Sequence, residues 1–352
     1  MNQHENNTNL VESPILFIIG NGFDLGLNMK TRYENVYETY VTTPSKSDTI
    51  TAFKNALPKE APYEKWSDFE MGMAEYSKTL SSEAELIECV RDFKSHMVKH
   101  LQNENEKVLS MVCNSDYFNG LVKELNRSFG EFYKCFSSNI IRQLDLIVDT
   151  SSLFYPRIIT FNYTTVLDVL LHMGSQFGNR IVEEPLHIHG TLNRDVVLGV
   201  DNIEQLQGKN YSISHKGSRA YIKTFFNQAY DINRVTQARK MISDSRIICT
   251  YGFSMGESDK TWVSSLVDWI KENPDHHLIV YQYEETEYHR YNFDEIMDAE
   301  EQKKEALFRK LNLTDRKLMD QIHIPVGYDI FNFTFQKTTS PSNITPGLYF
   351  LT

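Results

Sequence analysis

The chain has 352 residues, of which 41% are hydrophobic and 12% aromatic, enough to bury a large core. Its formal net charge of −11 disfavours general nucleic-acid binding, because such binders concentrate Lys and Arg against the phosphates. The first residues carry no basic and apolar leader, and no apolar run approaches the ~18 residues that cross a bilayer. We therefore expect a cytoplasmic protein that contacts neither membranes nor nucleic acid in general.

The four cysteines do not suggest a metal site or a disulfide framework. Cys89, Cys113, Cys135 and Cys249 are widely spaced, and no two of them form a C-x-x-C pair. Such pairs are typical of zinc ribbons, and dense cysteine frameworks are typical of small secreted domains. We expect reduced core cysteines and no metal.

Five short apolar runs predict the strands of a sheet. Their nearly continuous hydrophobicity is typical of strands that are covered on both faces, as in a parallel sheet. The runs are Ile15–Ile19, Arg157–Phe161, Val196–Val200, Arg246–Tyr251 and His277–Tyr283. They predict a single doubly wound α/β domain over residues 1–352 with a largely parallel sheet.

A long interval rich in Glu, Lys, Leu and Met separates the first two strands. It covers about residues 32–150, has few glycines and predicts several helices. A connection of that length exceeds an ordinary strand–helix–strand crossover, so we interpret it as a helical insertion in the α/β domain. Residues 294–313 predict a further helix, and the final residues, 338–352, are turn-rich.

Polar and small residues gather where the predicted strands end. The segments are GNGFD after the first strand, TFNYTT at the second, HIHGTLN before the third and YGFSMGESDK after the fourth. In an open parallel sheet the carboxyl ends of the strands form the ligand crevice, so these segments should converge there. This convergence predicts a binding site more strongly than any one motif.

The loop after the first strand has two interpretations. Gly20 and Gly22 allow a ligand to approach the backbone closely, as in a phosphate cradle, but a tight turn explains them equally well. The spacing to Gly26 misses the G-x-G-x-x-G dinucleotide fingerprint by one residue, which disfavours an ordinary Rossmann dehydrogenase. For Asp24 we favour a helix N-cap, with a hydrogen bond to ribose hydroxyls as the alternative.

Asn162 and His189 are the candidate catalytic residues. The Asn162 amide can orient a sugar hydroxyl or a water, or satisfy the turn at its strand end. His189 is a candidate general base because imidazole titrates near neutral pH, although a core histidine is the commoner case. In an extended segment His187 would face the same side, but we see no third ligand at metal spacing.

The segment after the fourth strand lacks the G-x-S-x-G order of a hydrolase nucleophile elbow. Ser254 and Asp259 can contact a ribose or phosphate, or cap the helix that follows. In the helical insertion, WSDFE predicts that Trp66 and Phe69 pack against the sheet. Its acids Asp68 and Glu70 are then either solvated or paired with a base.

Five segments together resemble one family over nearly the whole chain. They are IIGNGFDLGLNMKTRY, WSDFE, FNYTT, HIHG with the following LGVDN, and YGFSMGESD. In this order they resemble the abortive-infection AbiH family of bacterial anti-phage proteins. The resemblance implies a role in phage defence, in which an infected cell stops growing or dies before phage are released. It does not by itself imply a reaction.

A more remote resemblance offers a reaction. The order of a glycine loop, a T-x-N strand end, an H-G pair and a G-x-S strand end is similar to the sirtuin-like, Rossmann-like NAD-binding fold. The resemblance implies that Asn162 orients ribose or water and that His189 is the base. The NAD-binding residues that we predict are Gly20, Asn21, Gly22, Asp24, Arg32, Thr160, Gly252, Ser254 and Asp259.

Three departures and one absence refine this expectation. Thr164 stands where the sirtuin family's T-Q-N-I-D motif ends in Asp, and Asn21 and Asp24 replace small residues of the glycine loop. The absent zinc ribbon disfavours lysine deacylation, so the resemblance implies hydrolysis of NAD to nicotinamide and ADP-ribose, with no metal.

The same departures favour an alternative function. In it, the crevice binds NAD or ADP-ribose without cleaving it, and the protein acts as a sensor that signals to a partner effector. A nuclease-type toxin has the weakest support, because no carboxylate cluster has metal spacing. A homo-oligomer and a phage-encoded or operon-encoded protein both stay open as partners.

Overall fold

The computed structural model describes most of the chain. The described residues are 13–57, 66–112, 115–148, 156–175, 183–206, 211–229, 233–256, 259–282 and 292–333. The turn-rich end over residues 338–352 lies outside them. Cys89 and Cys249 are buried, Cys135 is half-buried, and all three are free thiols, while Cys113 also lies outside the described residues.

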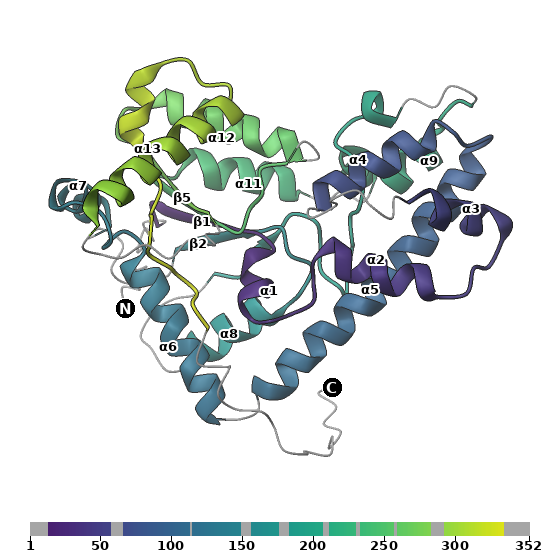
Figure 1. The fold of residues 1–352 in the computed structure, drawn as a ribbon, viewed down its shortest axis with the longest axis horizontal. Coiled ribbons are helices and arrows are strands. Elements are labelled where there is room, and N and C mark those ends of the chain that lie inside the picture. The colour runs from purple at the N-terminus through teal and green to yellow at the C-terminus, as the bar shows by residue number, and fades with distance from the viewer. Residues whose placement is uncertain are drawn as a thin grey trace, which may run out of the picture.

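Within the described residues, six parallel strands form one sheet (Figure 1). They are β1 (Ile15–Ile19), β2 (Arg157–Thr160), β3 (Leu186–His187), β4 (Ile247–Tyr251), β5 (His277–Tyr281) and β6 (Ile322–His323). The spatial order is β3-β2-β1-β4-β5-β6, and each neighbouring pair is parallel. This order is that of a doubly wound sheet, whose direction of winding reverses between β1 and β4.

Successive side chains of β1 point to opposite faces of the sheet, and each face is covered by a layer of helices. Ile15, Phe17 and Ile19 face one hydrophobic cluster, and Leu16 and Ile18 face another. The first cluster packs against α6 (Ser115–Glu131), α7 (Ser138–Val148) and α8 (Val166–Ser175). The second packs against α11 (Arg234–Ser243), α12 (Lys260–Glu272) and α13 (Phe293–Lys310). The predicted α/β class and its helix near the C-terminus are confirmed.

A third hydrophobic cluster forms what we call the helical lobe. It contains α2 (Tyr33–Thr42), α3 (Asp48–Ala56), α4 (Trp66–Ser77), α5 (Glu83–Val112), α9 (His215–Tyr221), α10 (Lys223–Ala229) and the loop 190–206. The predicted insertion is therefore helical, but α6 and α7 of that interval cover the sheet instead. Phe69 packs in the lobe, which corrects its expected place against the sheet, and the Trp66 side chain lies outside the described part.

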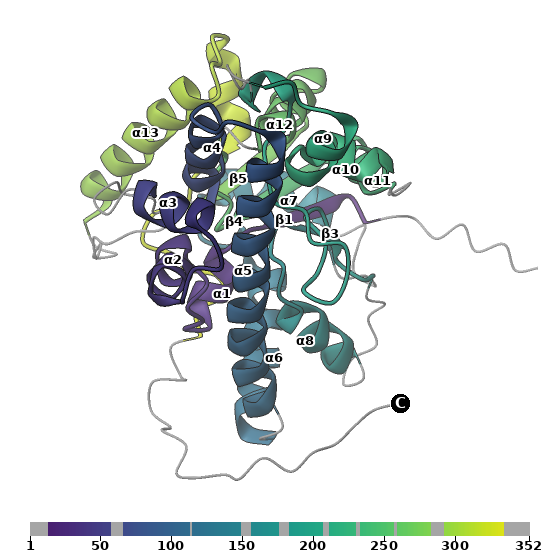
Figure 2. The same ribbon diagram turned by 90° about the vertical axis from the view of Figure 1, so that its right-hand side faces the viewer.

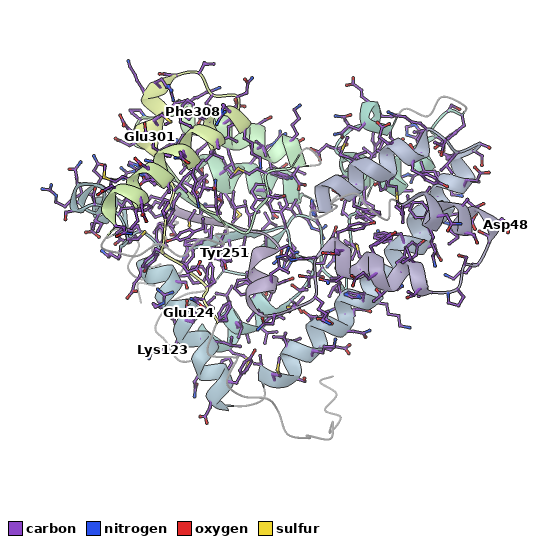
Figure 3. The ribbon with its side chains drawn as sticks, in the orientation of Figure 1. Asp48, Lys123, Glu124, Tyr251, Glu301 and Phe308 are labelled. Carbon is purple, nitrogen blue, oxygen red and sulfur yellow. The ribbon has the colours of Figure 1, made fainter. Side chains whose placement is uncertain are left out.

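Helix α5 connects the lobe to the sheet layer. Its 30 residues extend ~45 Å at 1.5 Å per residue, and it runs from the lobe toward α6 and α8 (Figure 2). Apolar side chains at helical spacing face the lobe core, namely Leu86, Val90, Phe93, Met97 and Leu101. Tyr251 lies near the middle of the molecule, whereas Asp48 of α3 lies at the outer end of the lobe (Figure 3).

The predicted strand Val196–Val200 is wrong. These residues are buried because Val196, Leu198 and Val200 pack in the helical lobe, and their backbone is not part of the sheet. Val197 N donates to His189 O at 2.8 Å, and Gly199 N donates to the Glu70 carboxylate at 2.9 Å. This apolar run therefore belongs to a loop that packs in the core of the helical lobe, and it is not a strand of the sheet.

Two glycine loops touch where the winding of the sheet reverses. Gly20 N donates to Tyr251 O at 2.9 Å, which joins the ends of β1 and β4. A Cβ atom on Gly22 would lie 2.6 Å from Gly252 Cα, and a Cβ atom on Gly252 would overlap Gly22 N. Gly252 also has φ +63°, which favours glycine. These glycines are therefore required by backbone packing, whether or not a ligand binds.

Gly252→Ala should lower the free energy of unfolding by about 2–5 kcal/mol, because it combines a strained φ with an overpacked contact. Gly130→Ala is the matched control, because a Cβ atom there meets nothing within 4 Å and the position is helical. It should leave the free energy of unfolding unchanged or raise it by up to ~1 kcal/mol. Urea denaturation measures both, and equal effects would contradict the packing argument.

Candidate functional site

A cavity of about 860 Å³ lies at the carboxyl ends of the strands. The predicted site residues that line it are Gly20, Asn21, Gly22, Asp24, Arg32, Asn162, His189, Gly252, Ser254 and Asp259. Of the predicted set, Thr160 is not among the lining residues. It is buried at the end of β2, where its hydroxyl accepts a hydrogen bond from Asn162 N at 3.1 Å. Segments that are far apart in the sequence thus share one cavity, and their roles stay predictions.

Asp24 is the centre of a buried polar cluster. It lies inside the short helix α1 (Gly22–Gly26), whose N-cap position is Asn21, so the N-cap interpretation of Asp24 is wrong. Its carboxylate accepts hydrogen bonds from Asn162 Nδ2 at 3.1 Å and from Thr164 Oγ1 at 2.8 Å. Burial raises the pKa of Asp24 to about 7, and the two hydrogen bonds only partly offset that effect.

Asn21 holds the glycine loop to the chain that follows α1. Its Nδ2 donates to Thr31 O at 3.1 Å, and its Oδ1 accepts from Thr31 Oγ1 at 2.6 Å. This pairing orients the entry to α2, where Arg32 occupies the N-cap position without a side-chain cap and is exposed at the cavity. Among the predicted site residues, Arg32 is the one arginine or lysine, and its side chain is exposed to solvent at the cavity.

His187 and His189 serve different neighbours, although they are two residues apart. His187 Nδ1 donates to Asn162 O at 2.9 Å, and its Nε2 donates to the Asp168 carboxylate at 2.9 Å. Burial would lower the pKa of His187, but the hydrogen bond and charge of Asp168 raise it. Among the described residues, no group of three or more His, Cys, Asp or Glu side chains could hold a metal ion.

His189 is buried against aromatic rings and faces a carboxylate. Its ring lies edge-on to Phe161, with 5.2 Å between centroids, and tilted against Tyr163. His189 Nε2 lies 3.3 Å from Asp259 Oδ1, an ion-pair distance without the alignment of a hydrogen bond. Asp259 occupies the N-cap position of α12 but makes no side-chain cap bond. Its carboxylate is directed to the site instead.

A buried lysine completes the charge network beside His189. Lys223 Nζ lies 2.9 Å from Asp259 Oδ1 and 3.0 Å from Glu70 Oε2. Glu70 is therefore paired with a base, one of its two expected states, while the Asp68 side chain lies outside the described part. Burial would raise the pKa of Asp259, but the charge of Lys223 and the contact with His189 hold it below its usual range.

Lys223 was missed by sequence reasoning. It lies in no segment with a recognisable spacing, and a single lysine at the start of a helix is commonly a solvated residue. Only the fold brings it next to Glu70 and Asp259, which lie 153 residues upstream and 36 residues downstream in the sequence.

Two aromatic rings that were not among the predicted site residues form part of the cavity wall, and the predicted residue Ser254 contributes backbone. Phe161 and Phe253 stack with 4.4 Å between ring centroids, and both line the cavity. Ser254 uses its backbone oxygen to accept a hydrogen bond from Lys310 Nζ at 2.7 Å. The cavity therefore combines aromatic walls, glycine backbone and a few convergent polar groups, as ligand sites commonly do.

A comparison with models of protein families identifies the family of this chain. A family model described as "Bacteriophage abortive infection AbiH" matches residues 16–281, well over half of the chain. No curated protein matches the chain. Among the described helices, none has both the length and the apolar character needed to cross a membrane. The resemblance to AbiH is confirmed, and the more remote resemblance to sirtuin-like folds stays a prediction.

Asp24→Asn should flatten the pH dependence of stability. The pKa of Asp24 in the folded protein, about 7, lies above its ordinary value of 3.8. Protonation of Asp24 therefore stabilises the folded protein at low pH. That contribution disappears as the pH rises toward 7. The free energy of unfolding of the parent should thus fall by about 2–3 kcal/mol more than that of Asp24→Asn between pH 5 and pH 8.

Urea denaturation at several pH values measures this difference. Asp298→Asn, at an exposed position of α13, is the control and should follow the parent. Parallel curves for the parent and Asp24→Asn would show that burial does not perturb Asp24.

Proposed function

The chain belongs to the AbiH family of bacteriophage abortive infection proteins, and we propose that it hydrolyses NAD to nicotinamide and ADP-ribose upon infection. The observation that carries the proposal is the His189–Asp259 pair, at 3.3 Å, in the wall of a cavity that also contains Asn162 and the glycine loops. A carboxylate beside an imidazole orients the ring for general-base work.

The cavity lies where a doubly wound sheet binds nucleotides. The winding reverses between β1 and β4, and both glycine loops follow these strands. Ligands of such sheets bind outside the carboxyl ends of the strands at this point. A volume of about 860 Å³ is within the usual range for small-molecule and cofactor sites. These features support a nucleotide as the ligand.

The reaction would need a fixed ribose, a positioned water and a proton acceptor. Water adds to C1′ of the ribose while the bond to the nicotinamide nitrogen breaks, and its electron pair leaves with nicotinamide. Because His189 Nε2 faces Asp259, Nδ1 is the nitrogen left to accept the proton of the water. Asn162 Nδ2 is held by Asp24, so its amide oxygen is the group that can orient ribose or water.

Asp24 and the packed glycines favour the alternative of a nucleotide sensor. A carboxyl group beside the glycine loop repels phosphate whenever it is ionised, and the loops pack on each other without a ligand. In this alternative the cavity binds NAD or ADP-ribose without cleaving it, and the helical lobe transmits the bound state to a partner effector.

His189→Ala and Asn162→Ala should each abolish phage protection while the protein remains folded. Release of nicotinamide from NAD should fall by about 10²–10⁴-fold for His189→Ala, which is the usual contribution of a general base. His215→Ala, at an exposed position of α9, is the matched control and should keep both activities.

Nicotinamide is measured with purified protein and in extracts of infected cells, because a protein restrained before infection can be inactive when purified. A folded His189→Ala protein that protects fully would disprove the assignment of the base. A parent that binds NAD but releases no nicotinamide in either preparation would establish the sensor instead.

A further inference from the structure

Lys223 is a fully enclosed cation that joins three parts of the fold. It begins α10, and its side chain is buried between Glu70 of α4 and Asp259 before α12. Burial would lower the pKa of Lys223, but the charges of Asp259 and Glu70 hold it above its usual range. The side chain is therefore cationic wherever these acids are ionised.

Acidic residues from three of the motifs quoted above interact with this lysine, and His189 contacts one of these acids. Glu70 belongs to WSDFE, Asp259 to YGFSMGESD and His189 to HIHG, and each belongs to the same network. Asp201 of LGVDN interacts electrostatically with Lys223, and its Oδ2 accepts hydrogen bonds from Thr261 N and Oγ1. Acids that are far apart in the sequence thus lie around one ammonium group.

Stability alone is a poor reason for such a network. Desolvation of buried charges offsets much of their mutual attraction, and apolar replacements of buried ion pairs are often neutral or stabilising. What the network does provide is geometry. Asp259 Oδ1 lies 2.9 Å from Lys223 Nζ and 3.3 Å from His189 Nε2, so the same oxygen contacts both the ammonium group and the imidazole.

We propose that Lys223 is a positioning residue for His189: it holds the Asp259 carboxylate against the imidazole, and Glu70 of the helical lobe holds Lys223 in turn. The inference rests on the proposed function in one respect, the role of His189 at the site. It does not depend on NAD being the molecule that reacts.

Glu70 makes this arrangement depend on the packing of the helical lobe. Its Oε1 accepts a hydrogen bond from Gly199 N at 2.9 Å, and its backbone oxygen accepts from Tyr221 OH at 2.7 Å. Lys223 N in turn donates to Val200 O at 2.9 Å. A displacement of α4 would therefore move Lys223, and with it the carboxylate that faces His189.

The test separates positioning from stability by comparing a single variant with a charge-balanced double variant. Lys223→Met removes the ammonium group from two buried carboxylates, Glu70 and Asp259, and should lower Tm. Glu70→Gln with Lys223→Met removes the buried pair together and should recover much of that Tm. If Lys223 positions His189, the double variant should still lose phage protection. Its kcat for nicotinamide release should fall by about 100-fold with little change in KM, as expected for a misplaced group.

Two further variants complete the set. Lys223→Arg keeps the charge and should retain part of the protection that Lys223→Met loses. Lys54→Met is the matched control, because Lys54 is also a buried lysine of the lobe but donates to Thr43 rather than to the carboxylates near His189. It should protect like the parent. Circular dichroism and Tm are measured for every variant.

Recovery of both Tm and protection in the double variant would overturn the inference, because Lys223 would then act through stability alone. If the parent releases no nicotinamide either as purified protein or in extracts of infected cells, NAD hydrolysis is disproved, and loss or recovery of phage protection in the same variants still decides the role of Lys223. The two failures are therefore distinguishable.

Discussion

The contact between two glycine backbones organises the site. Gly22 and Gly252 approach so closely that neither tolerates a Cβ atom, and this contact brings the carboxyl ends of β1 and β4 together. Because the winding of the sheet reverses there, β2 and β3 lie on one side of this contact and β5 and β6 on the other. A cavity between them follows from the topology, and the loop residues determine its chemistry.

The departures from the sirtuin pattern explain one another. Thr164 and Asp24 differ from the residues expected at their positions, and they are hydrogen-bonded to each other. Asn162 donates to the same carboxylate, so the expected ribose-orienting residue is fixed by a group that the pattern lacks. The side chain of Asn21, the third departure, is hydrogen-bonded to Thr31. Asp24, Asn162 and Thr164 therefore form a buried hydrogen-bonded cluster that the sirtuin pattern does not contain.

Sequence patterns predicted the elements whose cause is local. Strands β1, β2, β4 and β5 are continuous apolar runs and were predicted within a residue or two over their described part. The two-residue strands β3 and β6 contain a histidine each and have no such signal. The run Val196–Val200 was wrongly predicted to be a strand, because apolar residues also pack in the core of the helical lobe. Lys223 was missed because its ion-pair partners, Glu70 and Asp259, lie far from it in the sequence.

The helical lobe and the sheet layers meet at two walls of the cavity. On one side Tyr163 packs in the helical lobe and donates to Val197 O at 2.8 Å, while its neighbours Asn162 and Thr164 hold Asp24. On the other side Lys223 of the lobe contacts Asp259, which precedes α12 of the sheet layer. Packed cores shift between discrete arrangements rather than deform continuously. A rearrangement of the lobe would therefore reach Asn162 through the backbone and His189 through charge, so both candidate catalytic residues depend on how the lobe packs.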